Sequence, residues 1–227
     1  MFKQIVFSSV LAGIAAALLL SVLQIFWVTP LILQAETYEV AAEAVAHGHT
    51  ADDHAHDETA WQPEDGWQRT LSTISSNILM ASAFALMLAG AYALRKPPCI
   101  RQGLAWGLAG YAVFFAAPSL GLPPDLPGTA AAEVMARQVW WLGTALATAL
   151  GLGLLFLQSR WPLRATGILV LLIPHLLGAP QPEIAGSLAP EILQTQFRWV
   201  SALTNAVFWM ALGVSSSLTF NRMQNKP

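Results

Sequence analysis

Histidines and carboxylates, both common ligands of metal ions, concentrate in one segment of the chain, residues 34–69. This segment holds four of the five histidines and nine of the thirteen acidic residues of the 227-residue chain, and Arg69 is its only cation. The acids are Glu36, Glu39, Glu43, Asp52, Asp53, Asp57, Glu58, Glu64 and Asp65. The composition indicates a segment that attracts divalent cations.

The histidines of this segment form two His-x-His pairs with carboxylates beside them. Imidazole together with carboxylate suits cobalt, nickel, zinc or copper(II) better than calcium or magnesium. Affinity alone does not select cobalt, because copper and zinc bind such ligands more tightly. The alternative is a disordered polar loop whose histidines reflect only its composition. The predicted metal ligands here are His47, His49, His54, His56, Asp53 and Asp57.

Three carboxylates precede these pairs at helical spacing. Glu36, Glu39, Glu43 and His47 are three, four and four residues apart, so they share one face if the first helix continues to this point. The many alanines between positions 41 and 46 favour that continuation. We predict a stripe of metal ligands that passes a divalent cation along the helix. The alternative is the solvated face of a helix that leaves the membrane.

Five polar residues lie within or beside apolar stretches. His175 is an ionisable group at membrane depth, which makes it a candidate metal ligand; the alternative is an interfacial histidine bonded to water or backbone. Gln24, Asn77, Thr144 and Asn205 are candidates to line a shared hydrated path. They could equally be hydrogen-bonding contacts between helices, worth about 0.6–2 kcal/mol each.

The elements that carry these residues are apolar. The chain is 55% hydrophobic and 11% charged with a mean hydropathy of +0.53, whereas soluble domains are about 25% charged. Apolar runs predict six transmembrane helices, at about 5–33, 71–94, 103–120, 134–157, 163–178 and 200–220. The first run is too long for a cleaved signal peptide. We therefore expect an all-α polytopic membrane protein, a single membrane domain over 1–227 with residues 34–69 as a loop between spans one and two.

Basic residues orient this six-span arrangement. Eight of the eleven fall on one side, which is therefore predicted to be cytoplasmic, with both termini inside. The other side receives the loops at about 34–69, 121–137 and 179–198, which hold all thirteen acids. An anionic outer face would concentrate cations there. The eight are Lys3, Arg95, Lys96, Arg101, Arg160, Arg164, Arg222 and Lys226.

A weak internal repeat accompanies these spans. A proline lies near the outer end of each odd span (Pro30, Pro118 and Pro174), and an arginine begins each even span. We interpret the repeat as three helical hairpins in the same orientation; the alternative is chance recurrence. The arginines are Arg69, Arg137 and Arg198.

Those arginines lie at helix starts, where the helix dipole disfavours cations. Asp65 and Glu133 each precede an arginine by four residues, so the salt links Asp65–Arg69 and Glu133–Arg137 are geometrically available and are one interpretation. The alternative is that the arginines extend to lipid headgroups.

Several classes of function find no support. Nucleotide-binding, zinc-protease and serine-hydrolase motifs are absent from the sequence, as is a basic patch for nucleic acid. The single cysteine, Cys99, excludes a disulfide framework within one chain. We expect no enzyme and no tightly bound cofactor.

The sequence resembles the CbtA family of cobalt transporter subunits over essentially its whole length. The resemblance rests on residues 34–39 (QAETYE), the histidine segment, residues 61–69 (WQPEDGWQR) and residues 174–182 (PHLLGAPQP). It implies cobalt(II) as the transported ion, uptake linked to cobalamin synthesis, and a location in the bacterial cytoplasmic membrane. It also implies a small one-span partner subunit, CbtB-like, with histidines of its own. No residue's role follows from the resemblance.

We therefore expect this protein to take up a divalent transition metal. Its partners would be membrane lipid and, in a homo-oligomer, further copies of the same chain. A non-transporting metal-binding or assembly subunit of another permease is the first alternative. A membrane enzyme with an outer metal centre is the second, and it would need about three fixed ligands with one open position.

Overall fold

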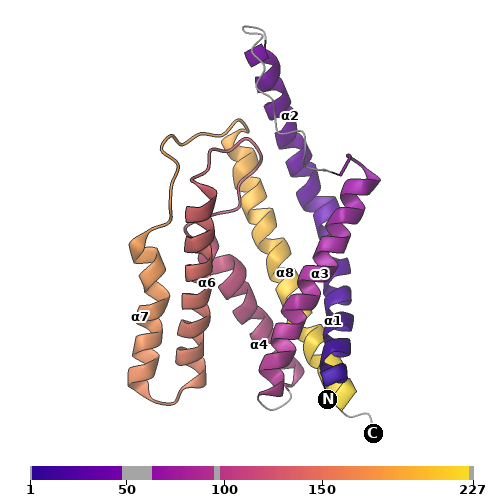
Figure 1. The fold of residues 1–227 in the computed structure, drawn as a ribbon, viewed down its shortest axis with the longest axis vertical. Coiled ribbons are helices and arrows are strands. Elements are labelled where there is room, and N and C mark those ends of the chain that lie inside the picture. The colour runs from indigo at the N-terminus through magenta and orange to yellow at the C-terminus, as the bar shows by residue number, and fades with distance from the viewer. Residues whose placement is uncertain (1, 48–62, 95–97, 225–227) are drawn as a thin grey trace.

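The structure is a computed structural model that describes residues 2–47, 63–94 and 98–224. The described residues are mostly helical and form no strand, only one isolated bridge between Thr129 and Ser187 (Figure 1). Two of the helical segments, η1 and η2, are π-helical turns. The order is α1 (Phe2–Leu23), η1 (Gln24–Val28), α2 (Thr29–His47), α3 (Trp67–Ala93), α4 (Ile100–Tyr111), η2 (Ala112–Ala116), α5 (Ala117–Ser119), α6 (Val134–Leu157), α7 (Trp161–Leu177) and α8 (Glu191–Gln224).

Four helices are long and apolar enough to cross a membrane: Lys3–Ala42, Trp67–Ala93, Val134–Leu157 and Glu191–Met223. The prediction of an all-helical membrane protein is confirmed to that extent. The fifth predicted span corresponds to α7, which is apolar but has only 17 residues. The third corresponds to a run over 100–119 that α4, η2 and α5 divide between them. The number of six spans stays a prediction.

The first helix continues well past the predicted end of its span. The segments α1, η1 and α2 follow one another without a break, and α2 rises beyond the other helices in Figure 1. The first part of the predicted outer loop, from residue 34 to residue 47, is therefore helical. This is the condition on which the predicted stripe of carboxylates depended.

The core forms where α1 packs against both α3 and α8. The contact is made of small side chains, including Ala12 and Ala16 from α1 and Ala81 and Ala85 from α3, all of them buried. A Cβ atom on Gly13 would lie only 2.6 Å from the backbone of Ser82. Lipid tails are as apolar as leucine, so membrane helices associate through such close packing.

Glycines make two further helix contacts equally close. The backbones of Gly103 and Gly107 in α4 touch Gly213 in α8, where an added Cβ would lie 2.3 Å from the carbonyl oxygen of Gly103. Gly151 of α6 and Gly167 of α7 approach each other in the same way. The α6–α7 pair is joined to the other helices through η2 and α5.

Each π-helical turn lies directly before a proline. The N–H of Thr29 bonds to the carbonyl of Gln24, and that of Ala117 bonds to the carbonyl of Ala112, five residues back in both cases. Pro30 and Pro118 follow; proline has no N–H to donate, and its ring clashes with the preceding turn of an α-helix. The π-helical turns relieve this conflict. The third proline of the predicted repeat, Pro174, lies inside α7 without such a turn.

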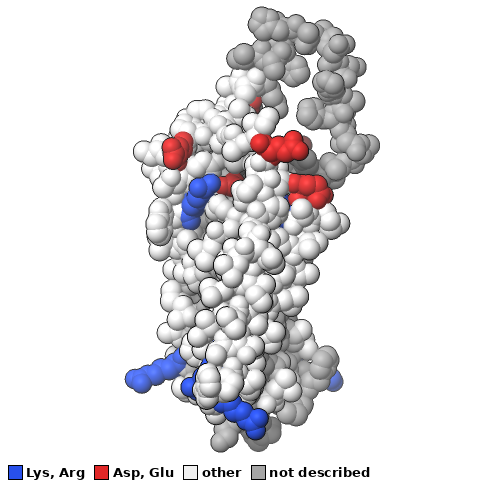
Figure 2. Space-filling view, turned by 90° about the vertical axis from the view of Figure 1, so that its left-hand side faces the viewer, with Lys and Arg blue, Asp and Glu red and all other residues white. Residues whose placement is uncertain are grey.

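Charge separates to the two ends of the molecule. Acidic side chains cluster at the upper end in Figure 2 and basic ones at the lower end, and arginines also lie among the acids, where Arg69 and Arg198 form ion pairs. The lower, basic end contains both termini, the start of α4 and the α6–α7 connection (Figure 1). The upper, acidic end contains α2 and the segments before α3, α6 and α8.

Candidate functional site

The strongest polar contact at the acidic end joins α2 to α3 through Arg69. Its guanidinium donates to both oxygens of Glu36, at 2.5 Å to Oε1 and 3.1 Å to Oε2, and also to Oδ1 of Asp65 at 2.9 Å. About a third of each side chain of the Glu36–Arg69 pair, 32%, is exposed. The predicted link between Asp65 and Arg69 is confirmed. The contact with Glu36, 33 residues away in the chain, was not predicted.

A cavity of about 230 Å³ lies beside this arginine. Its wall includes Arg69, Asp65 and four hydroxyl groups, and its other side chains are apolar; the hydroxyl groups are those of Ser21, Thr29, Thr70 and Thr73. Thr70 and Thr73 donate their hydroxyl protons to backbone carbonyls of their own helix region, at 2.9 Å each. Their oxygen lone pairs therefore remain free to accept. The wall offers oxygen acceptors to a cation or to its water shell.

Two of the predicted path residues meet directly at this level of the bundle. The side-chain amide of Asn77 in α3 donates to Oε1 of Gln24 at 2.6 Å and to Oγ of Ser21 at 3.0 Å. Gln24 opens the π-helical turn, and Ser21 also lines the cavity beside Arg69. Arg69, the hydroxyl groups and the Gln24–Asn77 pair thus form one polar cluster in the α1–α3 contact.

The other two predicted path residues do not join this cluster. Thr144 of α6 is fully buried and donates to the carbonyl of Trp140 in its own helix at 2.8 Å. Asn205 of α8 donates to the carbonyl of Ser201, again in its own helix, at 3.0 Å. The bond between Gln24 and Asn77 also fits the alternative role of a contact between helices.

Glu39 lies three residues after Glu36 and faces the segment that precedes α6. It is partly buried, and its Cγ lies 3.1 Å from where a Cβ on Gly128 would be. Gly128 has a φ of +73°, a conformation that side chains other than glycine rarely adopt, so the close approach of Glu39 depends on a glycine there.

A buried glutamine holds that segment in place, which sequence reasoning missed. Oε1 of Gln194 in α8 accepts from the N–H of Leu126 at 3.2 Å, and its amide nitrogen donates to Oγ of Ser187 at 2.9 Å and to Oγ1 of Thr129. Gln194 is only 5% exposed. Nothing in the local sequence distinguishes it from the other polar residues that begin α8.

The second predicted salt link, Glu133 with Arg137, is wrong. Glu133 instead caps α6, because its carboxylate accepts from the N–H groups of Met135 at 2.9 Å and Ala136 at 2.8 Å. These two bonds lower the pKa of the Glu133 carboxyl below its ordinary value. Arg198, the third arginine of the repeat, pairs across the chain with Asp125 at 2.8 Å.

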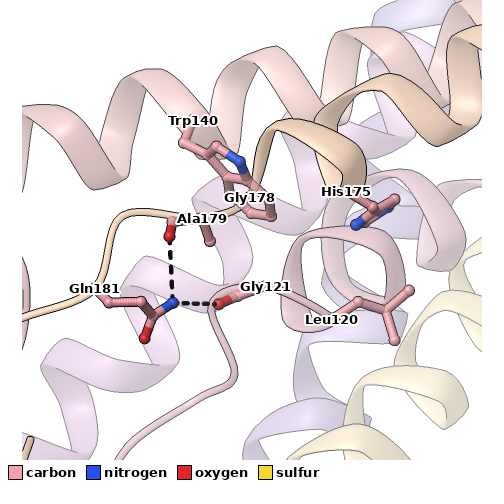
Figure 3. Close-up of a pocket in the computed structure, with 7 residues that line it drawn as sticks. All are labelled: Leu120, Gly121, Trp140, His175, Gly178, Ala179 and Gln181. Atoms are coloured by element: carbon pink, nitrogen blue, oxygen red, sulfur yellow. Dashed lines mark hydrogen bonds between the residues drawn. The ribbon is translucent and has the colours of Figure 1, made fainter.

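His175 lies in a separate cavity of about 380 Å³ between α6 and α7 (Figure 3). The edge of its ring faces Trp140, with 6.2 Å between the ring centroids. Gln181 lies at the other end of the group and donates to the carbonyls of Ala179 and Gly121. No carboxylate lines this cavity. His175 is therefore not part of the cluster around Glu36.

The remaining predicted ligands fall outside what the structure describes. His49, Asp53, His54, His56 and Asp57 lie between residues 48 and 62, and the side chains of Glu43 and His47 are likewise not described. Among the described side chains, no group of three or more histidines, cysteines and acids could hold a metal ion. The described part of the chain therefore forms no fixed metal centre, and the roles of Glu36 and Glu39 as metal ligands stay predictions.

Comparison with known proteins gives one match. The model of the family described as "Probable cobalt transporter subunit (CbtA)" matches residues 2–221, nearly the whole chain. No curated protein and no solved structure matches it. The match includes the polar cluster of α1 and α3 and the acidic end above it, and the apolar helices fit a protein of the membrane. The chain belongs to the CbtA family of cobalt transporter subunits.

Proposed function

We propose that this protein takes cobalt(II) across the cytoplasmic membrane, from its acidic end to its basic end, as the subunit of an uptake system that supplies cobalamin synthesis. The observation that carries the proposal is the position of Glu36. It belongs to the acidic end and is bonded to Arg69, which lines the cavity that Ser21, a partner of Asn77, also lines. A carboxylate at the top of a polar cluster between apolar helices is suited to a cation that moves into the bundle.

The route begins in the segment 47–57, where the four histidines and the neighbouring aspartates capture the ion. The ion then moves along α2, attracted by the carboxylates of Glu43, Glu39 and Glu36. All three lie on this helix, which extends to residue 47. Gln24 and Asn77 follow within the bundle. His175, Thr144 and Asn205 are assigned no step on this route, because their contacts lie elsewhere.

Six spans and a cytoplasmic basic end complete the proposal. The run over 100–119 and the 17-residue α7 would then also cross, and α7 has little length to spare against a bilayer. Both termini lie at the basic end (Figure 1), which suits a cytoplasmic location under the positive-inside rule. At 100 mV, inside negative, a dication gains about 4.6 kcal/mol on entering, so no motor within this chain is required.

The decisive experiment compares cobalt accumulation in cells with the intact chain and in cells with Glu36→Gln and Glu39→Gln together. We expect an initial rate at least tenfold lower in the variant, since each carboxylate attracts a dication by about 2 kcal/mol even in water and a loss of about 1.4 kcal/mol already corresponds to a factor of ten. Glu183→Gln is the matched control, because Glu183 is an exposed acid of the same end. Equal accumulation in all three strains would remove Glu36 and Glu39 from the route.

Replacement of the four histidines in the same assay tests the capture step. We expect a higher cobalt concentration at half-maximal uptake with an unchanged maximal rate. Purified protein in liposomes separates transport from the alternative of a metal-binding or assembly subunit, because that alternative predicts binding of cobalt without flux.

A further inference from the structure

The guanidinium of Arg69 already pairs with Glu36, the carboxylate at which the proposed route passes from α2 into the helix bundle. The guanidinium makes two bonds to Glu36 and a third to Asp65. Planar guanidinium and carboxylate groups match in this two-bond geometry, and arginine keeps its charge at every physiological pH. Any cation that reaches Glu36 must therefore compete with Arg69.

The surroundings of the pair allow such an exchange. Asp65 precedes α3 and is 79% exposed, so Arg69 can stay bonded to it at the protein surface after releasing Glu36. The cavity beside the pair holds about 230 Å³ and offers the hydroxyl oxygens of Ser21, Thr29 and Thr73. A cation seated there would be within reach of oxygen acceptors on both α1 and α3. Glu36 does not line the cavity itself, so its released carboxylate would reach the ion from α2 through the place that Arg69 now occupies.

The second ion pair of the acidic end lacks these features. Arg198 makes a single bond to Asp125, its side chain is 46% exposed, and neither residue lines either of the two cavities described above. A pair that only fastened the helices together would need no acceptor-lined space beside it. The contrast separates the Arg69 contact from an ordinary surface salt bridge, which contributes little.

We propose that Arg69 is a built-in competitor of the transported cation: it occupies Glu36 when no metal is present, and a dication must displace it to enter the hydroxyl-lined cavity. Arg69 thereby sets the metal concentration at which uptake begins. The inference rests on the proposed function, because it takes Glu36 as a ligand on the route.

The test measures cobalt uptake against cobalt concentration for Arg69→Gln, with Arg198→Gln as the matched control. Both variants remove one positive charge from an ion pair at the same end. We expect Arg69→Gln to lower the half-saturating cobalt concentration roughly fivefold, the scale of one partly exposed ion pair, and Arg198→Gln to leave it unchanged. Protein amounts in the membrane, measured for each variant, normalise the rates.

A double variant shows whether the effect passes through Glu36. In a Glu36→Gln background, Arg69→Gln should produce no further decrease. If Arg69→Gln reduces the amount of folded protein, Arg69→Lys replaces it; lysine keeps the charge without the two-bond geometry, so a smaller decrease is expected.

The outcomes distinguish this inference from the proposed function. If Glu36→Gln alone leaves uptake unchanged, the proposed route fails. If Glu36→Gln lowers uptake while Arg69→Gln leaves the half-saturating concentration unchanged or raises it, the route stands and the competitor role is overturned. The same holds if Arg198→Gln lowers that concentration as much as Arg69→Gln, because the effect then reflects only overall charge.

Discussion

At the scale of single residues, two acids of the acidic end use their charge differently. Glu36 is bonded to a cation from another helix, and its charge is available to a metal ion only after that bond breaks. Glu133 is bonded to the N–H groups of Met135 and Ala136 at the start of its own helix, so its charge stabilises α6. Sequence spacing made Glu133 a predicted partner of Arg137 and made Glu36 a predicted metal ligand, and it gave neither of these contacts.

The capping role of Glu133 gives a pH prediction. Its folded-state pKa lies below the ordinary 4.5, so its contribution to stability is present above pH 4.5 and is lost as the pH falls through the lower folded value. Thermal unfolding of the purified protein should show a lower midpoint for Glu133→Gln than for the unchanged chain at neutral pH. The difference should shrink below pH 4.5.

Glu183→Gln serves as the control, because it removes the same charge from the loop before α8. A difference between Glu133→Gln and the unchanged chain that stayed constant down to pH 3 would contradict the capping role.

The sequence predicted part of the site at this scale. The proximity of Asp65 to Arg69 and the face shared by Glu36 and Glu39 follow from helical spacing, which is local information. The bonds from Arg69 to Glu36 and from Asn77 to Gln24 join residues 33 and 53 positions apart. Such contacts depend on how two helices pack against each other, and residue spacing within one helix carries no information about that packing.

At the scale of elements, three helix pairs are held by glycine or by alanine contacts. The pairs are α1–α3, α4–α8 and α6–α7. Backbone atoms approach so closely at Gly107 that an added Cβ would lie 2.2 Å from the carbonyl oxygen of Trp209. Backbone atoms cannot move aside as the end of a flexible side chain can, so a methyl group added at Gly107 must push the two helices apart.

Gly107→Ala should therefore destabilise the protein by about 1–3 kcal/mol, the usual cost of overpacking. Gly143→Ala is the matched control in α6, because nothing lies within 4 Å of its Cβ position. The control should be neutral or stabilising, since alanine favours helix by about 1 kcal/mol over glycine. Thermal unfolding in lipid nanodiscs measures both, and equal midpoints would refute the close contact.

Helix positions were predictable where hydrophobicity alone sets them. The predicted span at 134–157 coincides with α6. The starts of α3 at Trp67 and α8 at Glu191 were missed, because polar first turns extend these helices beyond the apolar run. Hydropathy also does not predict π-helical turns, although the sequence does show the two prolines that follow them.

At the scale of the whole molecule, charge divides the described chain into an acidic and a basic end (Figure 2). The prediction of separated charges came from assigning the basic and acidic residues to the connections between apolar runs. The helices in Figure 1 run so that these connections fall at the expected ends. Which end faces the cytoplasm is a property of the membrane and of insertion, so it needs an experiment on cells.

The single cysteine provides that experiment. Cys99 is exposed and precedes α4 at the basic end. A membrane-impermeant maleimide should fail to label it in intact cells and should label it in inverted membrane vesicles. In a Cys99→Ser background, Glu183→Cys at the acidic end should show the reverse, and labelling of Cys99 from outside would invert the proposed orientation.

The π-helical turn after α1 has a consequence for how Gln24 and Glu36 are aligned. They are twelve residues apart (36 − 24), and at about 100° per residue an uninterrupted α-helix would place them about 120° apart around its axis. The turn absorbs one extra residue, which reduces this angle to about 20° and lets both side chains bond to α3, at Asn77 and Arg69. Removing one residue among positions 25–28 would remove that extra residue together with the turn, so an uninterrupted α-helix would still place the two side chains about 20° apart and both would still reach α3.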